Sequence, residues 1–253
     1  MLLTKTPLPF LAFAAVGVLG LALRRRDEEY RWFLGLGLGA LGVLLVALMS
    51  PINLGVRHVL VIYPLVALAA AYGIVRWGED SRLRAPMLST GVVLLAAQFA
   101  LLIASVPNQI AYFNILAGSD PAHVSSDSDF DWGQDFLAME RYFETHPVPE
   151  LYVKLNGSTN VCSLRLPPIK DLPTQPVSGW VAVSERIYRM NKGSGFDPEN
   201  PCDPLSGLKA TPAPPGWLDW LKARKPVAII GKTIRLYHIA DAEIADAPPQ
   251  DSP

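Results

Sequence analysis

An arginine and a histidine stand side by side at the start of a long apolar run. Arg57 and His58 lie in the segment NLGVRHVLVIYP, residues 53–64. A guanidinium can bind a phosphate through two parallel hydrogen bonds, and the start of a helix would add its positive dipole end. Arginine is also common as an anchor at a membrane surface. The pair therefore indicates either a phosphate contact or an interfacial anchor.

A second group of chemically capable residues is the segment DSDFDWGQD, residues 127–135, in which carboxylates alternate. The alternation is typical of a calcium loop, but Trp132 stands at the sixth position instead of glycine and Ala138 at the twelfth instead of glutamate. A short D-x-D pair also occurs among the metal-binding carboxylates of nucleotide-sugar transferases. We expect no metal site, with a divalent metal as the weaker alternative.

The structural interpretation of this segment is that Asp129 or Asp131 caps a helix that begins at residue 133. The loop could instead face an acceptor molecule or the membrane part of the chain. Under either interpretation the residues of interest are Asp127, Asp129, Asp131, Trp132, Gln134 and Asp135.

The sequence has two cysteines, Cys162 and Cys202. Both lie in the C-terminal part of the chain, after the apolar runs. We expect this C-terminal part to lie in a compartment that permits disulfides, so the sequence predicts one bridge between them. Two isolated cysteines without nearby histidines make a poor zinc site.

The elements that must position Arg57 and His58 are apolar helices. Uncharged runs occupy residues 8–23, 32–49, 59–75 and 86–106. At 1.5 Å per residue these runs match a hydrocarbon core of about 30 Å, so the sequence predicts four transmembrane helices within residues 1–106. In the second run, Gly35, Gly39 and Gly42 predict a face that allows close helix contact.

The basic residues of the short connections predict the orientation. Those between the first and second runs and between the third and fourth are Arg24, Arg25, Arg26, Arg31, Arg76, Arg82 and Arg84. The opposite side carries only Lys5 and Arg57. Because positive loops stay cytoplasmic, the N-terminus and the long C-terminal part are expected outside the cytoplasm. The first run lacks the charge order of a signal peptide, so we expect it to be retained as a span.

Residues 107–240 read as a small α/β domain, and 241–253 as a disordered tail. The spacing of apolar residues predicts a helix over 133–146, and β-rich runs lie at 151–157, 179–185 and 226–239, the last split at Gly231 as in a hairpin. A further helix is expected from Pro215. The net charge of −1 gives no indication of a nucleic-acid partner.

Three ordered segments carry a resemblance to a known family: KTPLPFL at 5–11, NLGVRHVLVIYP at 53–64 and NQIAYFNILAGSDPAHVSSDSDFDWGQD at 108–135. With them the chain resembles the C-terminal half of bacterial phospholipid-carrier-dependent glycosyltransferases. These are GT-C membrane proteins of glycosyltransferase family 39 type, similar to protein O-mannosyltransferases and aminoarabinose transferases.

This resemblance implies a GT-C membrane fold in the bacterial inner membrane and a polyprenyl-phosphate-linked sugar as donor. Arg57 and His58 would contact the donor phosphate, while membrane lipid surrounds the helices. The family's acidic catalytic residue lies in a first extracytoplasmic loop that has no counterpart in this sequence, so no catalytic residue is assigned here. The expectation is an enzyme part that needs an N-terminal half or a partner subunit. The alternative is a non-catalytic, membrane-anchored binding or assembly subunit.

Overall fold

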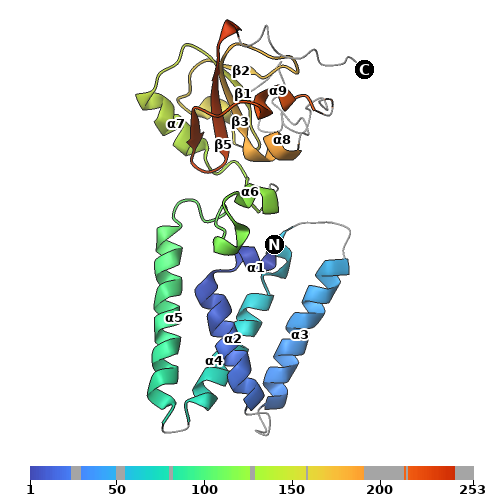
Figure 1. Cartoon of the computed structure of the whole chain (residues 1–253), viewed down its shortest axis with the longest axis vertical. Coiled ribbons are helices and arrows are strands. Elements are labelled where there is room, and N and C mark those ends of the chain that lie inside the picture. Colours follow the sequence, from blue (N-terminus) through green and yellow to red (C-terminus); the bar gives the residue numbers. More distant parts are fainter. Residues whose placement is uncertain are drawn as a thin grey trace. The chain divides into compact units, whose positions relative to one another are not determined.

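The computed structural model describes residues 1–23, 30–49, 55–79, 82–125, 129–157, 159–190, 214 and 216–242. The chain divides into two compact units, a helical unit of Met1–Pro121 and an α/β unit of Ala122–Pro253 (Figure 1). The sequence places this boundary at 106–107. The helical unit extends further because residue 114 hydrogen-bonds back to the first few residues of the chain.

Short helical turns join the long apolar helices of the helical unit. Its elements are α1 (Leu2–Lys5), α2 (Leu8–Leu23), α3 (Tyr30–Met49), the 3₁₀ turn η1 (Val56–Val59), α4 (Ile62–Trp77), α5 (Arg84–Ala104) and the 3₁₀ turn η2 (Ile115–Ala117). The short α6 (Pro121–Val124) follows at the boundary between the two units.

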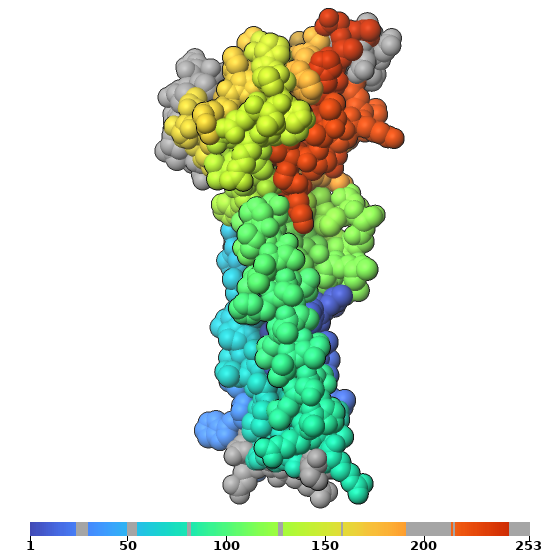
Figure 2. Space-filling model, turned by 90° about the vertical axis from the view of Figure 1, so that its left-hand side faces the viewer, coloured from blue at the N-terminus to red at the C-terminus, as the bar shows by residue number. Residues whose placement is uncertain are grey.

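Two of the described helices, α3 and α5, are long and apolar enough to cross a membrane. They have 20 and 21 residues, or about 30 and 32 Å, whereas α2 and α4 have 16 each, or about 24 Å. Four spans of full length are therefore not seen among the described residues. Only 6% of the most apolar window of α3 or of α5 is buried inside the unit. Figure 2 shows the surface of α5 exposed along its whole length.

The tightest packing in the helical unit joins α2 to α4 through small residues. A Cβ atom added to Gly17 would lie 2.2 Å from the Cα of Ala70, and one added to Gly73 would lie 1.9 Å from the Gly17 carbonyl oxygen. Only residues without bulk allow backbones to come so close.

The glycine face predicted on α3 makes no close contact with the described residues, although α3 packs against α4 elsewhere, with the Phe33 ring stacked on Tyr72. Cβ atoms added to Gly35, Gly39 and Gly42 would meet nothing within 4 Å. Small residues three positions apart make the close contact between the first and third apolar runs, because Gly17 and Gly20 of α2 face Ala70 and Gly73 of α4.

The α/β unit is built around one five-stranded mixed sheet. Its strands are β1 (Leu151–Lys154), β2 (Ile169–Asp171), β3 (Gly179–Ser184), β4 (Ala228–Ile230) and β5 (Ile234–Ile239), in the order β2-β1-β3-β5-β4. Its helical elements are α7 (Phe136–Thr145), the 3₁₀ turn η3 (Val161–Ser163), α8 (Glu185–Met190) and α9 (Asp219–Lys222). Strands β1, β2 and β3 are parallel, and β5 is antiparallel to both β3 and β4.

Each face of the sheet has its own hydrophobic core. On one face Phe136, Met139 and Phe143 of α7 pack with Leu151 and Leu236. On the other, Ile187 of α8 and the α9 segment pack with Val181 and Tyr237. This arrangement gives three layers, as Figure 1 shows, and it explains why β3 has consecutive buried apolar residues that serve the two cores in turn.

Several elements differ from the sequence-based prediction. The helix predicted from residue 133 begins at Phe136, and the helix expected from Pro215 is limited to Asp219–Lys222 in the described part. Strand β2 and helix α8 were not predicted at all. The hairpin split at Gly231 is present. Of the expected tail, residues 243–253 lie outside the described part.

Candidate functional site

Arg57 and His58 lie on η1, at the end of the helical unit where α4 begins. Gly55 precedes the turn with φ 80°, a conformation that favours glycine. Val56 and Val59 are buried and share one side of the turn, because residues three apart eclipse in a 3₁₀ helix. Arg57 and His58 are consequently exposed on the opposite side.

The same end of the unit holds a hydrogen-bonded cluster, formed by Thr6, Tyr63 and Asn114. The hydroxyl oxygens of Thr6 and Tyr63 are 2.7 Å apart. The side-chain nitrogen of Asn114 donates to the carbonyl oxygen of Thr6 at 2.6 Å. Thr6 and Asn114 are 3% and 6% exposed and so lie in the interior of the unit, whereas Tyr63 is partly buried.

Lys5 strengthens the same junction. Its ammonium donates to the carbonyl oxygen of Ile110 and lies 4.3 Å from the centre of the Phe113 ring. The ring of Phe10 lies 5.4 Å from that of Tyr63. Residues from 5–10, 63 and 110–114 are thus joined at one end of the helices. These contacts were missed from the sequence; their only signal was that all three segments belong to the family-like motifs.

Chemically, this end of the unit offers a guanidinium and an imidazole on an exposed turn, backed by a fully hydrogen-bonded interior. A guanidinium presents paired donors that match phosphate or carboxylate geometry. The backing cluster limits the conformations open to the chain that carries them. The described arrangement therefore suits binding of an anionic group better than it suits proton transfer.

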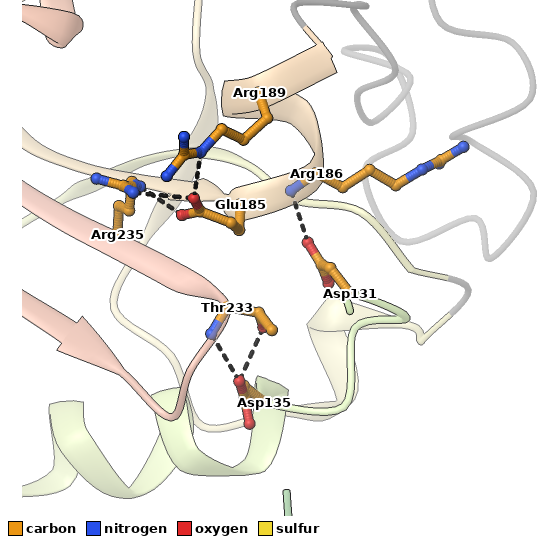
Figure 3. Close-up of polar contacts among 7 residues, drawn as sticks. All are labelled: Asp131, Asp135, Glu185, Arg186, Arg189, Thr233 and Arg235. Carbon is orange, nitrogen blue, oxygen red and sulfur yellow. Dashed lines mark hydrogen bonds and ion pairs between the residues drawn. The ribbon is translucent and has the colours of Figure 1, made fainter. Parts of the chain in front are cut away.

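The acidic segment lies in the other unit, and its Asp131 and Asp135 carboxylates accept hydrogen bonds inside the fold (Figure 3). Asp131 is 1% exposed. Its two carboxylate oxygens accept hydrogen bonds from the backbone N–H groups of Gly133, at 3.0 Å, and Arg186, at 3.1 Å. Its backbone carbonyl accepts a hydrogen bond from the side chain of Asn156. Asp131 therefore joins its loop to the residues that follow β1 and β3.

Asp135 holds the turn between β4 and β5. One carboxylate oxygen accepts from the backbone N–H groups of Lys232 and Thr233 and from the Thr233 hydroxyl, at 2.7–2.9 Å. Gly231 leaves room for this carboxylate, since an added Cβ would lie 2.2 Å from its carbon. The prediction that Asp129 or Asp131 caps this helix was wrong: Asp135 stands at the N-cap position of α7, and its side chain forms no cap hydrogen bond.

The remaining residues of this loop have distinct environments. Asp129 is 9% exposed, whereas Trp132 is half exposed. Gln134 fixes the loop internally: its oxygen accepts from the Trp132 backbone N–H and its nitrogen donates to the Phe130 carbonyl oxygen. Asp127 lies outside the described residues.

The position of this loop is informative because α/β proteins commonly bind ligands beyond the carboxyl ends of parallel strands, where the strand order reverses. Here β1 lies between β2 and β3, so the reversal is at β1. Gly133 packs so closely over the residues after β1 that an added Cβ would lie 2.7 Å from the Asn156 carbonyl oxygen. The chain's own Asp131–Gly133 segment therefore covers the usual ligand position.

Burial raises the pKa of Asp131 above its ordinary value. Hydrogen bonds from Gly133, Arg186 and Ser184 oppose this effect, and the nearby negative charge of Asp135 adds to it. The net direction is upward because loss of solvation is the largest cause.

A buried ion network, missed from the sequence, lies at the end of β3. The carboxylate of Glu185, 4% exposed, pairs with the guanidinium groups of Arg189, at 2.7 Å, and Arg235 (Figure 3). Arg235 also lies over the Tyr188 ring, 4.3 Å from its centre. The sequence signal was weak, because Glu185 and Arg235 are 50 positions apart.

A second buried pair joins the ends of two parallel strands. The Lys154 ammonium lies 2.9 Å from both carboxylate oxygens of Asp171. Burial raises the pKa of the Asp171 carboxyl, although the Lys154 charge opposes the shift. Lys154 also lies over the Trp217 ring. These groups are satisfied by one another, so they indicate a structural role.

Among the described residues, no group of three or more His, Cys, Asp or Glu side chains could hold a metal ion. Cys162 takes part in a disulfide. Cys202, the other cysteine of the sequence, lies outside the described part, so the predicted pairing of the two stays a prediction.

Comparison of the chain with protein-family models, with curated proteins and with solved structures gave no match.

Proposed function

We propose that this chain is the C-terminal part of an integral-membrane glycosyltransferase that uses a polyprenyl-phosphate-linked sugar as donor. Arg57 and His58 contact the donor phosphate. A carboxylate from an N-terminal half or a partner subunit acts as the base that takes the acceptor proton. The sugar then passes to an extracytoplasmic acceptor, and the lipid phosphate leaves.

The observation that carries the proposal is the meeting of the three family-like segments. Thr6, Tyr63 and Asn114 come from KTPLPFL, NLGVRHVLVIYP and the segment that begins NQIAYFN, and they form one hydrogen-bonded cluster. Tyr63 lies in the first turn of α4, which begins at Ile62. The exposed turn with Arg57 and His58 ends at Val59, three positions before that helix begins. Segments that share a site in folded space are expected to share a function.

Helix lengths give additional support. The upper ends of α2 and α4 lie below those of α3 and α5 (Figure 1), and α2 and α4 are shorter by about 6–8 Å. In a bilayer, polar groups at such short helix ends would lie near the headgroup boundary and require internal hydrogen bonds. A lipid phosphate occupies this depth. A polar cluster there suits a ligand with an apolar tail and an anionic head.

The proposal includes four membrane spans, α2 to α5, with the basic connections in the cytoplasm. The N-terminus and the α/β unit then lie outside the cytoplasm, in the inner membrane of a bacterium. The apolar side chains on the outer surfaces of α3 and α5 would contact lipid; examples are Val46, 72% exposed, and Phe99, 67% exposed.

The direct test is transfer from a radiolabelled polyprenyl-phosphate sugar in membranes that contain this chain, alone and together with a candidate N-terminal half. We expect transfer only with both parts, at least about 100-fold reduced by Arg57→Ala and partly kept by Arg57→Lys. Arg31→Ala, on the predicted cytoplasmic side, serves as the control and leaves transfer unchanged. Equal transfer by wild type and Arg57→Ala would contradict the role of Arg57.

The second candidate is a non-catalytic membrane-anchored binding or assembly subunit, with which internally bonded carboxylates are equally compatible. The carboxylates of Asp131 and Asp135 are occupied by hydrogen bonds inside the fold, which leaves them poorly suited as catalytic bases. Co-purification with a glycosyltransferase that is fully active without this chain would support the subunit function and argue against the transferase function.

A further inference from the structure

The hydrogen bonds around Thr6 have only one consistent direction. The Thr6 hydroxyl donates its single proton to the Leu2 carbonyl oxygen at 2.7 Å. The 2.7 Å contact with Tyr63 must therefore use the Tyr63 O–H as donor and the Thr6 oxygen as acceptor. Thr6 thus links the C-terminal end of α1 to the first turn of α4.

Asn114 uses both donor protons and the acceptor oxygen of its side chain. The two protons of its amide nitrogen go to the carbonyl oxygens of Leu3 and Thr6, both at 2.6 Å. Its side-chain oxygen accepts from the backbone N–H of Leu116 at 2.8 Å. Its own backbone N–H donates to the Thr4 carbonyl oxygen, also at 2.8 Å. Only an amide can satisfy two carbonyls and one N–H at once.

The connection continues from Tyr63 toward the exposed turn. The backbone N–H of Tyr63 donates to the Leu60 carbonyl oxygen at 3.1 Å, and Leu60 directly follows η1. Within η1, Val56 and Val59 anchor the turn by burial. The orientation of Arg57 and His58 is thus limited from one side by the buried valines and from the other by Tyr63.

We propose that Asn114 and Thr6 are positioning residues that hold the Arg57–His58 turn, through Tyr63, in the orientation that receives an anionic lipid phosphate. The ligand in this statement rests on the proposed function. The mechanical part, that Asn114 and Thr6 fix the turn, does not. Neither residue contacts the phosphate; both act by limiting the motion of the segment that does.

The experiment uses the full chain in nanodiscs and four variants. Thr6→Val removes the hydroxyl at nearly constant volume and leaves the Tyr63 O–H without its acceptor, whereas Thr6→Ser keeps both hydrogen bonds. Asn114→Asp directs a carboxylate oxygen at the carbonyls of Leu3 and Thr6. Arg57→Ala serves as the ligand-contact reference. Hydrogen–deuterium exchange of residues 56–63 and the affinity for undecaprenyl phosphate are measured well below the unfolding temperature.

We expect faster exchange over residues 56–63 in Thr6→Val and Asn114→Asp, with exchange of α5 unchanged. Their affinity for undecaprenyl phosphate falls about 5-fold and about 10-fold or more, respectively, as for loss of one good hydrogen bond or of several. Thr6→Ser stays within about twofold of wild type in both measurements, because its hydroxyl replaces the lost one.

The inference is overturned if Arg57→Ala loses binding while Thr6→Val and Asn114→Asp keep wild-type exchange and affinity. It is also overturned if these two variants lower only the unfolding temperature, since a purely structural role would do so. Failure of the proposed function looks different: wild type then does not bind undecaprenyl phosphate. In that case the exchange comparison alone decides whether Asn114 and Thr6 hold the turn.

Discussion

The two units of this chain satisfy their polar groups in opposite ways. In the described helical unit, buried side-chain hydrogen bonds concentrate at one end, around Thr6 and Asn114, while the helices pack through glycine. In the α/β unit, buried charges such as Glu185 and Lys154 are paired across strands and helices. An exposed cationic turn beside a satisfied cluster thus stands out in the first unit, whereas charge in the second is structural.

The comparison is most severely tested by breaking a buried ion pair of the α/β unit. Glu185→Ala leaves Arg235, 18% exposed at its side chain, without its carboxylate, and we expect a loss of about 3–5 kcal/mol in the free energy of unfolding. Denaturant unfolding of the full chain measures it. Arg165→Ala removes an exposed partner of Glu140 and should cost less than about 1 kcal/mol. Similar losses in both variants would contradict the distinction.

The corresponding test of the helical unit concerns glycine packing. Gly73→Ala would force its Cβ into the Gly17 carbonyl, so we expect a loss of about 3 kcal/mol or separation of α2 from α4. Thermal unfolding in detergent gives the measurement. Gly39→Ala on α3 is the matched control, because open space surrounds its Cβ position. A destabilised Gly39→Ala variant with a normal Gly73→Ala variant would reverse the assignment of the packing face.

A smaller effect is expected at the hairpin turn. Asp135→Asn keeps the size of the side chain but weakens acceptance from Lys232 and Thr233, and we expect a loss of about 2 kcal/mol. Chemical denaturation followed by near-ultraviolet circular dichroism reports on this unit. Asp219→Asn changes an exposed carboxylate and should leave stability within about 0.5 kcal/mol. An unchanged midpoint for Asp135→Asn would show that the turn does not need the charge.

The smallest effect is a pH dependence. Because the pKa of Asp131 is raised in the folded state, the native protein binds a proton more tightly there than the unfolded chain. This contribution to stability is present at low pH and is lost as pH rises from about 4 through the raised pKa. The free energy of unfolding of wild type should therefore fall relative to that of Asp131→Asn as pH rises over that range. Parallel pH profiles for the two proteins would contradict the assignment to Asp131.

Local patterns in the sequence predicted much of this fold. The apolar stripe of Phe136, Met139 and Phe143 predicted α7, and the break at Gly231 predicted the hairpin. The pattern was less informative for β2, whose three residues follow two prolines, and for α8, whose first residue continues directly from a strand. Short elements of this kind are defined by their tertiary neighbours more than by their own residues.

The candidate site was only partly predictable for the same reason. Arg57 and His58 were evident as charged residues beside an apolar run. The hydrogen-bonded cluster behind them was not evident, because Thr6 and Asn114 are 108 residues apart in the sequence. The acidic segment misled in the opposite direction: Asp131 was a candidate helix cap in the sequence, but its carboxylate accepts from the backbone N–H groups of Gly133 and of Arg186, 55 positions later.

The hydrogen bonds of Asn114 also have a consequence for biosynthesis. Its side chain caps carbonyls of Leu3 and Thr6, so this end of α1 cannot be completed until 108 further residues have been made. At about 5–20 residues per second, the delay after Thr6 is about 5–20 s. During that time α2 to α5 enter the membrane in the proposed topology. The segment with Lys5 and Thr6 then docks last, so the cationic turn gains its final support only when the whole helical unit has been synthesised.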